Sequence, residues 1–347
     1  MKQFIKFIAY LQVIGIVLVV LGHSFHEYPD GEMGKSMLLY RMLYSFRMPL
    51  FMFVSGFLMV FTTRLRASTE RPGVVGFFKL KLRRLLLPFV VLTVVTFIPR
   101  AAMSGFADDN IELSLTSFCR SFFYADSLVI PFFWFLQASF ILLVLSYAVI
   151  TVGEKARVGN VTLYLLIILL FVVLPFLPFD YGQFFSVNEA VRLGIYFALG
   201  AAYSRFAAAV DRVIPWTSPI FLLAAVAVWA ALFFLTENTL WIRLCSVVGI
   251  AMCISVAKLM ERHGVTILDH LVGANYMIFL LSWYCNVATQ QVLHHLVQLP
   301  WWCYTLLSLV SGIYIPWLGY RYLQSHPDSR WVRVTALLLG QSFKKRG

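Results

Sequence analysis

Charged residues are scarce in this chain of 347 residues. Asp, Glu, Lys and Arg together make up 13% of it, apolar residues make up 61%, and the mean hydropathy is +0.82. A soluble domain carries a larger charged share because its surface faces water. The composition therefore excludes an ordinary soluble enzyme and predicts a protein that crosses a membrane many times.

Acidic residues are scarcer than basic ones, 16 against 28, so the formal net charge is +12. In a soluble protein such an excess would indicate a nucleic-acid partner. In a membrane protein, Lys and Arg gather in cytoplasmic loops and near anionic lipid, and this preference explains the excess more simply. We therefore expect membrane lipids, and no nucleic acid, as partners.

Paired cysteines and common catalytic motifs are also missing. The five cysteines show no CxxC and no metal-ligand spacing, and four of them lie inside apolar runs, where free Cys acts as a small apolar side chain. The chain contains no P-loop, no GxSxG and no HExxH. These absences predict no disulfide framework, no metal site and no permanently bound cofactor.

What the chain has in plenty is apolar runs, about ten of roughly membrane-spanning length. They cover residues 5–23, 38–62, 85–99, 131–152, 161–178, 191–208, 218–235, 240–258, 272–296 and 301–321. Lipid-exposed backbone must satisfy its own hydrogen bonds, and the runs are too long for barrel strands. We therefore predict an all-α polytopic membrane protein with about ten transmembrane helices. The first run is too long and continuous for a signal peptide and is interpreted as the first span.

Lys and Arg are concentrated in alternate loops between these runs. The positive-inside rule places those loops, including the basic loop 63–84, in the cytoplasm. Both termini are then cytoplasmic if there are ten spans. We expect one transmembrane domain over residues 1–325 and a basic amphipathic segment over 326–347 that lies on the inner membrane surface. His23 would face outward.

The first run carries polar residues that a lipid-facing helix would not need. Its end reads YLQVIGIVLVVLGHSFHE, in which Gln12 and His23 are separated by eleven residues, nearly three helical turns. His26 follows three residues later on the same face, and Glu27 could orient a ring or hold its charge. An imidazole can move a proton near neutral pH. The alternative is a helix-end histidine that only hydrogen-bonds a neighbour, with His26 and Glu27 as ordinary loop residues.

Two arginines lie near the outer end of the second run. Arg41 and Arg47 are about 240° apart on a straight helix, so both cannot point at one place unless Pro49 breaks the register. We expect Arg47 to face inward, where its planar guanidinium suits a phosphate or a carboxylate. Ser55 and Gly56 in mid-run indicate close helix packing, and no base for a nucleophilic Ser55 lies nearby in sequence.

A basic stretch, FFKLKLRRLLLP, opens the third run. The positive-inside rule alone accounts for its charge. A phosphate site for a cytosolic nucleotide or coenzyme A is the functional alternative, because Lys81 and Arg84 share a helical face and Arg83 adds a third cation. Trp134 opens a later run, where aromatics are typical of the membrane interface.

The order of these segments resembles the membrane-integral acyltransferase type 3 family. The matching segments are Val19–Ser24, Phe46–Phe57, Arg84–Pro88, Trp134–Leu136 and, for a late family element, Gly273–Leu281. Two positions depart from the family pattern. Members usually carry Arg or Lys where this chain has Gln12, and often His where it has Ser282.

The resemblance implies a ten-span enzyme of the bacterial cytoplasmic membrane that O-acylates a cell-surface or lipid-linked glycan. The acyl group would come from a cytosolic acyl-CoA, with acetyl-CoA as the expected co-substrate, and His23 matches the family's essential histidine. Donor-binding positions would be Lys81, Arg83 and Arg84. Acceptor or transition-state contacts would be Arg47, His26, Glu27, Ser55, Gln12 and Trp134. A transporter or flippase for a lipid-linked glycan is the alternative.

Overall fold

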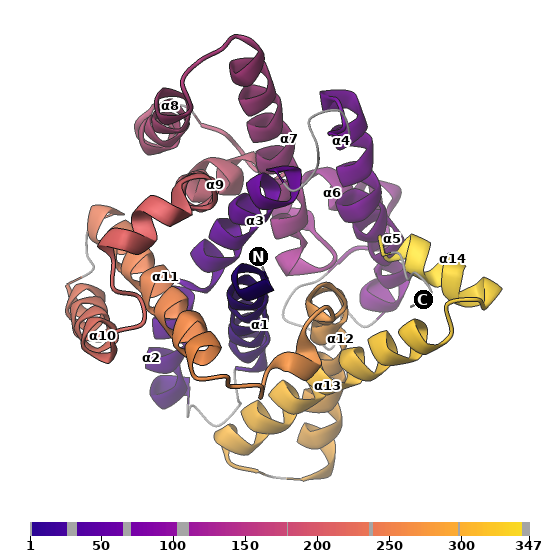
Figure 1. The fold of residues 1–347 in the computed structure, drawn as a ribbon. Coiled ribbons are helices and arrows are strands. Elements are labelled where there is room, and N and C mark those ends of the chain that lie inside the picture. The colour runs from indigo at the N-terminus through magenta and orange to yellow at the C-terminus, as the bar shows by residue number, and fades with distance from the viewer. Residues whose placement is uncertain are drawn as a thin grey trace. The chain divides into compact units, whose positions relative to one another are not determined.

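The computed structural model describes residues 2–25, 33–64, 71–102, 111–178, 180–235, 239–297 and 299–341. Within these ranges the regular elements are helices, and the only extended pairing is one isolated bridge between Tyr124 and Phe184. The predicted all-α class is confirmed (Figure 1).

The helical elements follow one another along the described chain. They are α1 (Lys2–Ser24), α2 (Met33–Tyr44), α3 (Arg47–Arg64), α4 (Val74–Lys81), η2 (Leu82–Leu86), α5 (Leu87–Ala102), α6 (Leu115–Phe123), η4 (Ala125–Ser127), η5 (Pro131–Phe133), α7 (Trp134–Lys155), α8 (Asn160–Val173), η6 (Leu174–Phe176), α9 (Val187–Val213), α10 (Pro219–Phe234), α11 (Thr239–Arg262), η7 (Asp269–Leu271), α12 (Asn275–Leu296), α13 (Trp301–Ser325) and α14 (Arg330–Leu338).

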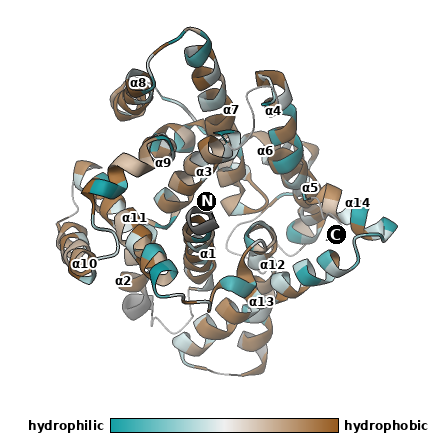
Figure 2. Ribbon diagram, viewed as in Figure 1, coloured by the Kyte–Doolittle hydropathy of each residue, from teal (hydrophilic) through white to brown (hydrophobic). Residues whose placement is uncertain are grey.

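Seven helical stretches in the described part of the chain are long and apolar enough to cross a membrane. They are Lys6–Ser24, Met37–Arg64, Val74–Ala102, Pro131–Lys155, Val187–Val213, Leu240–Arg262 and Trp301–Ser325. Two shorter apolar helices cover Asn160–Phe176 and Pro219–Phe234. Figure 2 shows how far apolar residues dominate these helices. Each predicted run overlaps a helix, while the count of ten and the orientation of the termini stay predictions.

The chain divides into two compact units. The first comprises Met1–Val54 and Phe206–His326, and the second comprises Ser55–Arg205 and Pro327–Gly347. One boundary falls within α3 and another at a kink in α9, where Phe206 has non-helical backbone angles. The division is geometric, so the single domain over 1–325 stays a prediction.

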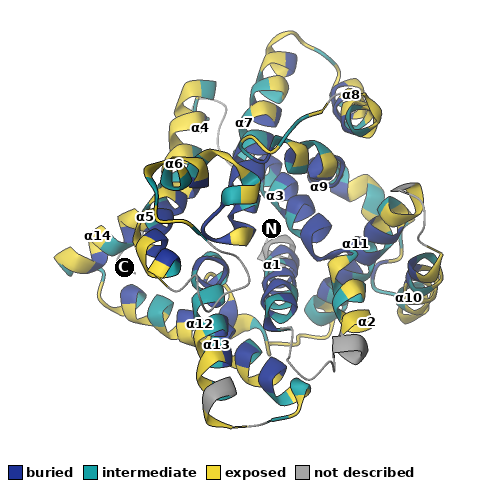
Figure 3. Cartoon of the chain, turned by 180° about the vertical axis from the view of Figure 1, so that it is seen from behind, coloured by how far each residue is buried: buried dark blue, intermediate teal, exposed yellow. Residues whose placement is uncertain are grey.

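Helix α1 is the core of the first unit. It packs against α11, α12, α13 and α2, and none of its described side chains is fully exposed (Figure 3). Tyr10, Leu11, Val13 and Ile16 have no accessible surface. Polar side chains within a span are costly in lipid, so a helix that carries Gln12 and His23 is favoured where other helices surround it, as they surround α1.

The N-terminal half of α1 is tied to the loop before α12. The hydroxyl oxygen of Tyr10 lies 2.6 Å from Asp269 Oδ1 and 2.6 Å from the Val265 carbonyl oxygen, and its one hydrogen can be donated to either. Lys6 Nζ lies 3.9 Å from Asp269 Oδ2. Because Tyr10 is fully buried, these hydrogen bonds satisfy a hydroxyl that would otherwise be costly to enclose. These contacts fix the position of α1 along its own axis within the first unit.

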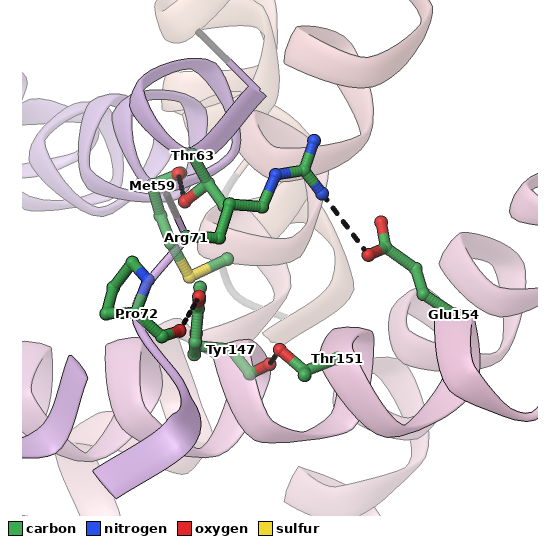
Figure 4. A network of polar contacts seen from close by, with 7 residues as sticks. All are labelled: Met59, Thr63, Arg71, Pro72, Tyr147, Thr151 and Glu154. Atoms are coloured by element: carbon green, nitrogen blue, oxygen red, sulfur yellow. Dashed lines mark hydrogen bonds and ion pairs between the residues drawn. The ribbon is translucent and has the colours of Figure 1, made fainter. Parts of the chain in front are cut away.

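The second unit holds the start of α4 firmly on α7 (Figure 4). Tyr147 donates to the Pro72 carbonyl at 2.6 Å, and its ring stacks on that of Phe77 with centroids 3.9 Å apart. Arg71 Nη1 lies 3.5 Å from Glu154 Oε2. The basic stretch that follows Phe77 therefore begins from an anchored turn.

The described part of the C-terminal segment is amphipathic, in agreement with its sequence. In α14 the residues Val332 and Ala336 are buried and face α5, whereas Trp331, Arg330 and Arg333 are exposed. An exposed face that combines Trp with Arg suits a membrane surface. The placement of this segment on the inner leaflet stays a prediction.

Candidate functional site

His23 lies one residue before the end of α1. Its neighbours Gly22 and Ser24 are buried, whereas His23 itself is partly exposed. The backbone around position 23 is therefore enclosed, while the residue itself keeps some accessible surface. A proton-transfer residue needs this combination of fixed position and access.

Polar side chains of α12 hold the end of α1 in place. Gln290 Nε2 donates to the Ser24 carbonyl at 3.0 Å, and Asn286 Nδ2 lies 3.4 Å from the Val20 carbonyl and from Ser24 Oγ. Ser24 Oγ also donates to the Val20 carbonyl at 2.8 Å. The last carbonyls of a helix lack intrahelical donors, and these side chains supply donors inside the protein. We call Ser24, Asn286 and Gln290 the α1 clamp.

Asn286 is also tightly packed on the side that faces α13. An added Cβ on Gly312 of α13 would lie 2.0 Å from Asn286 Oδ1, so α13 approaches because that position is glycine. With its amide rotated by half a turn, the Asn286 nitrogen donates to the carbonyl of Ser308 at 2.8 Å and of Ser282 at 3.2 Å. In either orientation the amide joins α12 to a neighbouring helix.

Arg47 is placed by a break in the second predicted span. Residues 38–62 were expected to form one helix, but α2 ends at Tyr44 and α3 begins at Arg47. The break precedes Pro49, which lacks an N–H and is best tolerated in the first turn of a new helix. Helices α10 and α11 hold the break: Ser246 Oγ donates to the Ser45 carbonyl at 2.6 Å, and Trp229 Nε1 lies 3.3 Å from Ser45 Oγ.

The Arg47 side chain is 3% exposed, whereas Arg41 is exposed, as the sequence indicated. Its guanidinium carbon lies 4.8 Å from the ring centre of Tyr44 and 5.4 Å from that of Tyr40. An added Cβ on Gly22 would lie 1.3 Å from Arg47 Nη1. Glycine at position 22 therefore makes room for the guanidinium.

His23 and Arg47 thus form one cluster at the end of α1. The guanidinium is close enough to influence the imidazole electrostatically, and Gly22, the neighbour of His23, touches it. Gln12 lies on the same helix and is half-buried, but eleven residues correspond to about 16 Å along the axis. Of the three predicted site residues described in the first unit, the structure therefore brings His23 and Arg47 together and leaves Gln12 apart.

The basic stretch of the second unit changes helix type in its middle. Lys81 ends α4, and Arg83 and Arg84 lie in η2, a π-helical turn closed by the bond from Leu87 N to the Leu82 carbonyl. Both arginines are exposed, and Lys81 Nζ lies 5.0 Å from the ring centre of Phe77. Such turns are rare and frequently occur at functional sites.

The comparison with known proteins identifies the family of the chain that carries these residues. A family model described as an acyltransferase domain, Acyl_transf_3, matches residues 5–321, nearly the whole chain. The chain belongs to the acyltransferase 3 family. No curated protein and no solved structure matches it. The family predicted from the motifs is confirmed, and the protein is a multi-pass membrane acyltransferase.

Two other predicted positions of the acyltransferase lie in the second unit. Ser55 is half-buried in α3, and its neighbour Gly56 packs against the backbone of α9, where an added Cβ would lie 2.0 Å from the Phe197 carbonyl. The packing interpretation of this pair is therefore confirmed. Trp134 opens α7 directly after the turn Pro131–Phe133 and is partly exposed. Acceptor contacts by Ser55 and Trp134 stay predictions.

His26 and Glu27 lie outside the described residues. The sequence drew attention to Ser282, which is buried in α12, but missed Asn286 and Gln290, which follow it at helical spacing on one face. Polar residues four apart in an otherwise apolar run were the available signal. Their partner on α1 lies more than 260 residues away along the chain, which no local pattern reveals.

Proposed function

We propose that this acyltransferase moves an acetyl group from cytosolic acetyl-CoA to a hydroxyl of a cell-surface or lipid-linked glycan, with His23 as general base. The observation that carries the proposal is the cluster of an imidazole and a guanidinium at the end of the enclosed helix α1, in a chain of an acyltransferase family. The enzyme would work in the bacterial cytoplasmic membrane with His23 toward the outer face.

The chemistry follows from these two groups. His23 accepts the proton of the acceptor hydroxyl while the hydroxyl oxygen attacks the carbonyl carbon of the thioester. The tetrahedral intermediate collapses when the carbon–sulfur bond breaks, and the leaving thiolate of coenzyme A takes the proton from His23. General-base help of this kind contributes about 10²–10⁴-fold. Arg47 either stabilises the oxyanion of the intermediate or holds the acceptor.

The donor would bind through Lys81, Arg83 and Arg84. Coenzyme A carries several phosphate charges, and exposed cations attract them without needing one fixed geometry. Their cytoplasmic location follows from the predicted topology. Gln12, Ser55, Trp134, His26 and Glu27 remain proposed acceptor or transition-state contacts.

The test uses the protein purified in detergent with labelled acetyl-CoA and a glycan fraction. The wild type should transfer the label or hydrolyse the thioester, and His23→Ala should be at least about 100-fold slower. His263→Ala, which changes an exposed histidine just after α11, should keep the wild-type rate. Equal gel-filtration elution and unfolding temperature show that the variants are folded. A folded His23→Ala protein with the wild-type rate would refute the role of His23.

The same preparation distinguishes an acyltransferase from the alternative, a flippase for a lipid-linked glycan. A flippase would leave the thioester intact in every variant and would move a lipid-linked glycan across a vesicle membrane. An acyltransferase consumes acetyl-CoA and releases free thiol. Mass spectrometry of surface glycans from cells with and without this protein then identifies the acceptor and the acyl group.

A further inference from the structure

Arg47 is a buried cation with unused hydrogen-bond donors. Its side chain is 3% exposed, and its Nε and Nη1 atoms have no hydrogen-bond partner among the described residues. Arginine stays protonated in proteins, so the charge cannot be removed by losing a proton. A buried charge of this kind is costly unless an anion compensates it.

The aromatic neighbours of Arg47 compensate only part of that cost. The rings of Tyr40 and Tyr44 lie within cation–π distance of its guanidinium carbon. A cation–π contact uses the face of a ring and consumes no N–H donor. The two rings therefore hold the guanidinium in place while donors on Nε and Nη1 remain available.

The described part of the first unit offers no carboxylate for this role. Its acidic residues are Asp211, Glu261 and Asp269. Asp211 lies 2.6 Å from Lys258 Nζ, and Asp269 accepts from Tyr10, about 20 Å back along α1 from His23. Glu261 is three residues from Lys258 on α11, at the end of the helix opposite to the residues that hold the α2–α3 break.

We infer that Arg47 binds a negatively charged group of the acceptor, a phosphate or a carboxylate, and that the acceptor is therefore an anionic sugar. This inference rests on the proposed function, which supplies the acceptor. The anion would lie beside Gly22, the residue that precedes His23 in the chain. Binding a charged group there would fix the sugar so that one hydroxyl meets the base, and such positioning raises the rate of transfer.

The inference makes Arg47 an acceptor-binding residue and not the oxyanion stabiliser. The two roles differ in what Arg47→Gln changes. An oxyanion stabiliser is needed whenever the thioester is attacked, by a sugar or by water. An acceptor-binding residue is needed only for the charged sugar, so hydrolysis of acetyl-CoA without acceptor should survive its removal.

The first experiment measures binding without any acyl donor. Glucose 1-phosphate and glucuronate serve as probes for phosphate and carboxylate, and glucose is the neutral control. Each anionic probe that fits should raise the unfolding temperature of the wild type by about 2 °C or more, while glucose should not. Arg47→Gln should abolish the shift. Equal shifts for glucose and both anions would overturn the inference.

A pair of glycine variants provides a matched control on α1. Gly22→Ala would place a Cβ on Arg47 Nη1 and displace the guanidinium, so it should abolish the anion shift while Arg47 is still present. Gly15→Ala would place a Cβ 3.1 Å from the Phe51 ring, a flexible neighbour, and should keep the shift. Loss of the shift in Gly15→Ala but not in Gly22→Ala would contradict the site.

Four acids of the first unit, at positions 27, 30, 32 and 237, lie outside the described residues and are tested directly. The quadruple variant Glu27→Gln, Asp30→Asn, Glu32→Gln, Glu237→Gln should bind both probes as the wild type does. If it gains or loses the anion shift, a carboxylate of this chain is the partner of Arg47 and the inference is wrong. The inference also fails if an anionic phospholipid gives the Arg47-dependent shift and neither sugar does.

The second experiment measures transfer of labelled acetyl to the three sugars. Wild-type kcat/KM should be roughly tenfold or more higher for an anionic sugar than for glucose, the effect of one charge-assisted hydrogen bond. Arg47→Gln should remove that preference and leave acceptor-free hydrolysis within about twofold. A parallel loss of hydrolysis would make Arg47 the oxyanion stabiliser and overturn the inference. If the wild type consumes no acetyl-CoA but anions bind through Arg47, the proposed function fails and the anion site stands.

Discussion

Two sets of arginines in this acyltransferase differ in almost every physical respect. Arg47 is enclosed at the start of α3, against Gly22 and two tyrosine rings. Arg83 and Arg84 are exposed on a single π-helical turn. An exposed cation is solvated and screened by salt, so it attracts phosphates from a distance but discriminates little between them. An enclosed cation has lost its water and therefore responds strongly to the one anion that reaches it.

Among the arginine variants, the largest effect should come from replacing the enclosed Arg47. Arg47→Gln should lower kcat/KM for the anionic acceptor by roughly 10- to 100-fold, because it removes charge-assisted hydrogen bonds in a water-poor site. Arg83→Gln and Arg84→Gln should each raise the KM for the donor by less than about tenfold, because exposed charges contribute little individually. Steady-state kinetics with the acceptor and the donor varied in turn separate the two effects.

The reverse pattern would break the comparison. If Arg84→Gln abolished transfer while Arg47→Gln left it intact, the exposed turn would carry the specific recognition. Lys155→Gln is a suitable control for an exposed basic residue of the second unit outside the π-helical turn, and it should leave both KM values unchanged.

The second prediction concerns the α1 clamp, which positions His23. Asn286→Ala should lower the free energy of unfolding by about 1–3 kcal/mol, because buried polar groups on α1 or, with the amide rotated, on α12 and α13 lose their partner. It should also lower kcat, because the end of α1 is no longer held. Denaturation curves and transfer rates measured on one preparation test both effects.

A neighbour on the same helix separates stability from positioning. Thr289 Oγ1 donates to Ser311 Oγ at 2.7 Å and makes no hydrogen bond to α1 among the described residues. Thr289→Ala should therefore cost stability and leave kcat unchanged. Equal losses of kcat in Thr289→Ala and Asn286→Ala would mean that α12 acts only as scaffold.

The third prediction is that the ligand-free protein gains stability when Arg47 is lost. Arg47→Met should raise the free energy of unfolding by about 1 kcal/mol or more, because it removes an uncompensated buried charge and keeps an apolar stem. Removing an exposed arginine, as in Arg83→Gln, should change stability by less than about 0.5 kcal/mol. A strong destabilisation by Arg47→Met would indicate that the chain itself supplies a partner for the guanidinium.

The smallest effect is expected from a change in salt concentration, which should act differently on the exposed and the enclosed arginines. Raising the ionic strength should increase the KM for acetyl-CoA several-fold, and the double variant Arg83→Gln, Arg84→Gln should flatten that dependence. The preference of the wild type for an anionic sugar should change less, because its cation is enclosed. Titrations with sodium chloride at fixed pH give both slopes, and equal slopes would remove the distinction between the two sets of arginines.

Composition and apolar runs predicted the fold class because lipid admits few alternatives for the backbone. The inward position of Arg47 was also predictable, since Pro49 allows the helix to break before it. Two features were not. Residues 38–62 were expected to form one long helix, yet Ser45 and Phe46 interrupt it. The Ser45 carbonyl accepts a hydrogen bond from Ser246. The hydrogen bonds that hold this break come from helices some 200 residues further along the chain.

The π-helical turn at Leu82–Leu86 was also not predicted from the sequence. Local propensities do not distinguish it from an α-helix, because all of its residues are good helix formers. In the structure the Arg84 carbonyl lies beside Gly340, where an added Cβ would be 2.5 Å away and the positive φ of 65° suits glycine. Packing of this kind, between segments more than 250 residues apart, is set by the tertiary fold.

The central claim is that the imidazole at position 23 takes the proton of the acceptor hydroxyl. Single-turnover transfer of labelled acetyl by His23→Gly, with and without added imidazole, tests it most directly, because the residue lies at the accessible end of α1. We predict a loss of at least about 100-fold and a rate that recovers as imidazole is added. Transfer at the wild-type rate by His23→Gly without imidazole would contradict the account.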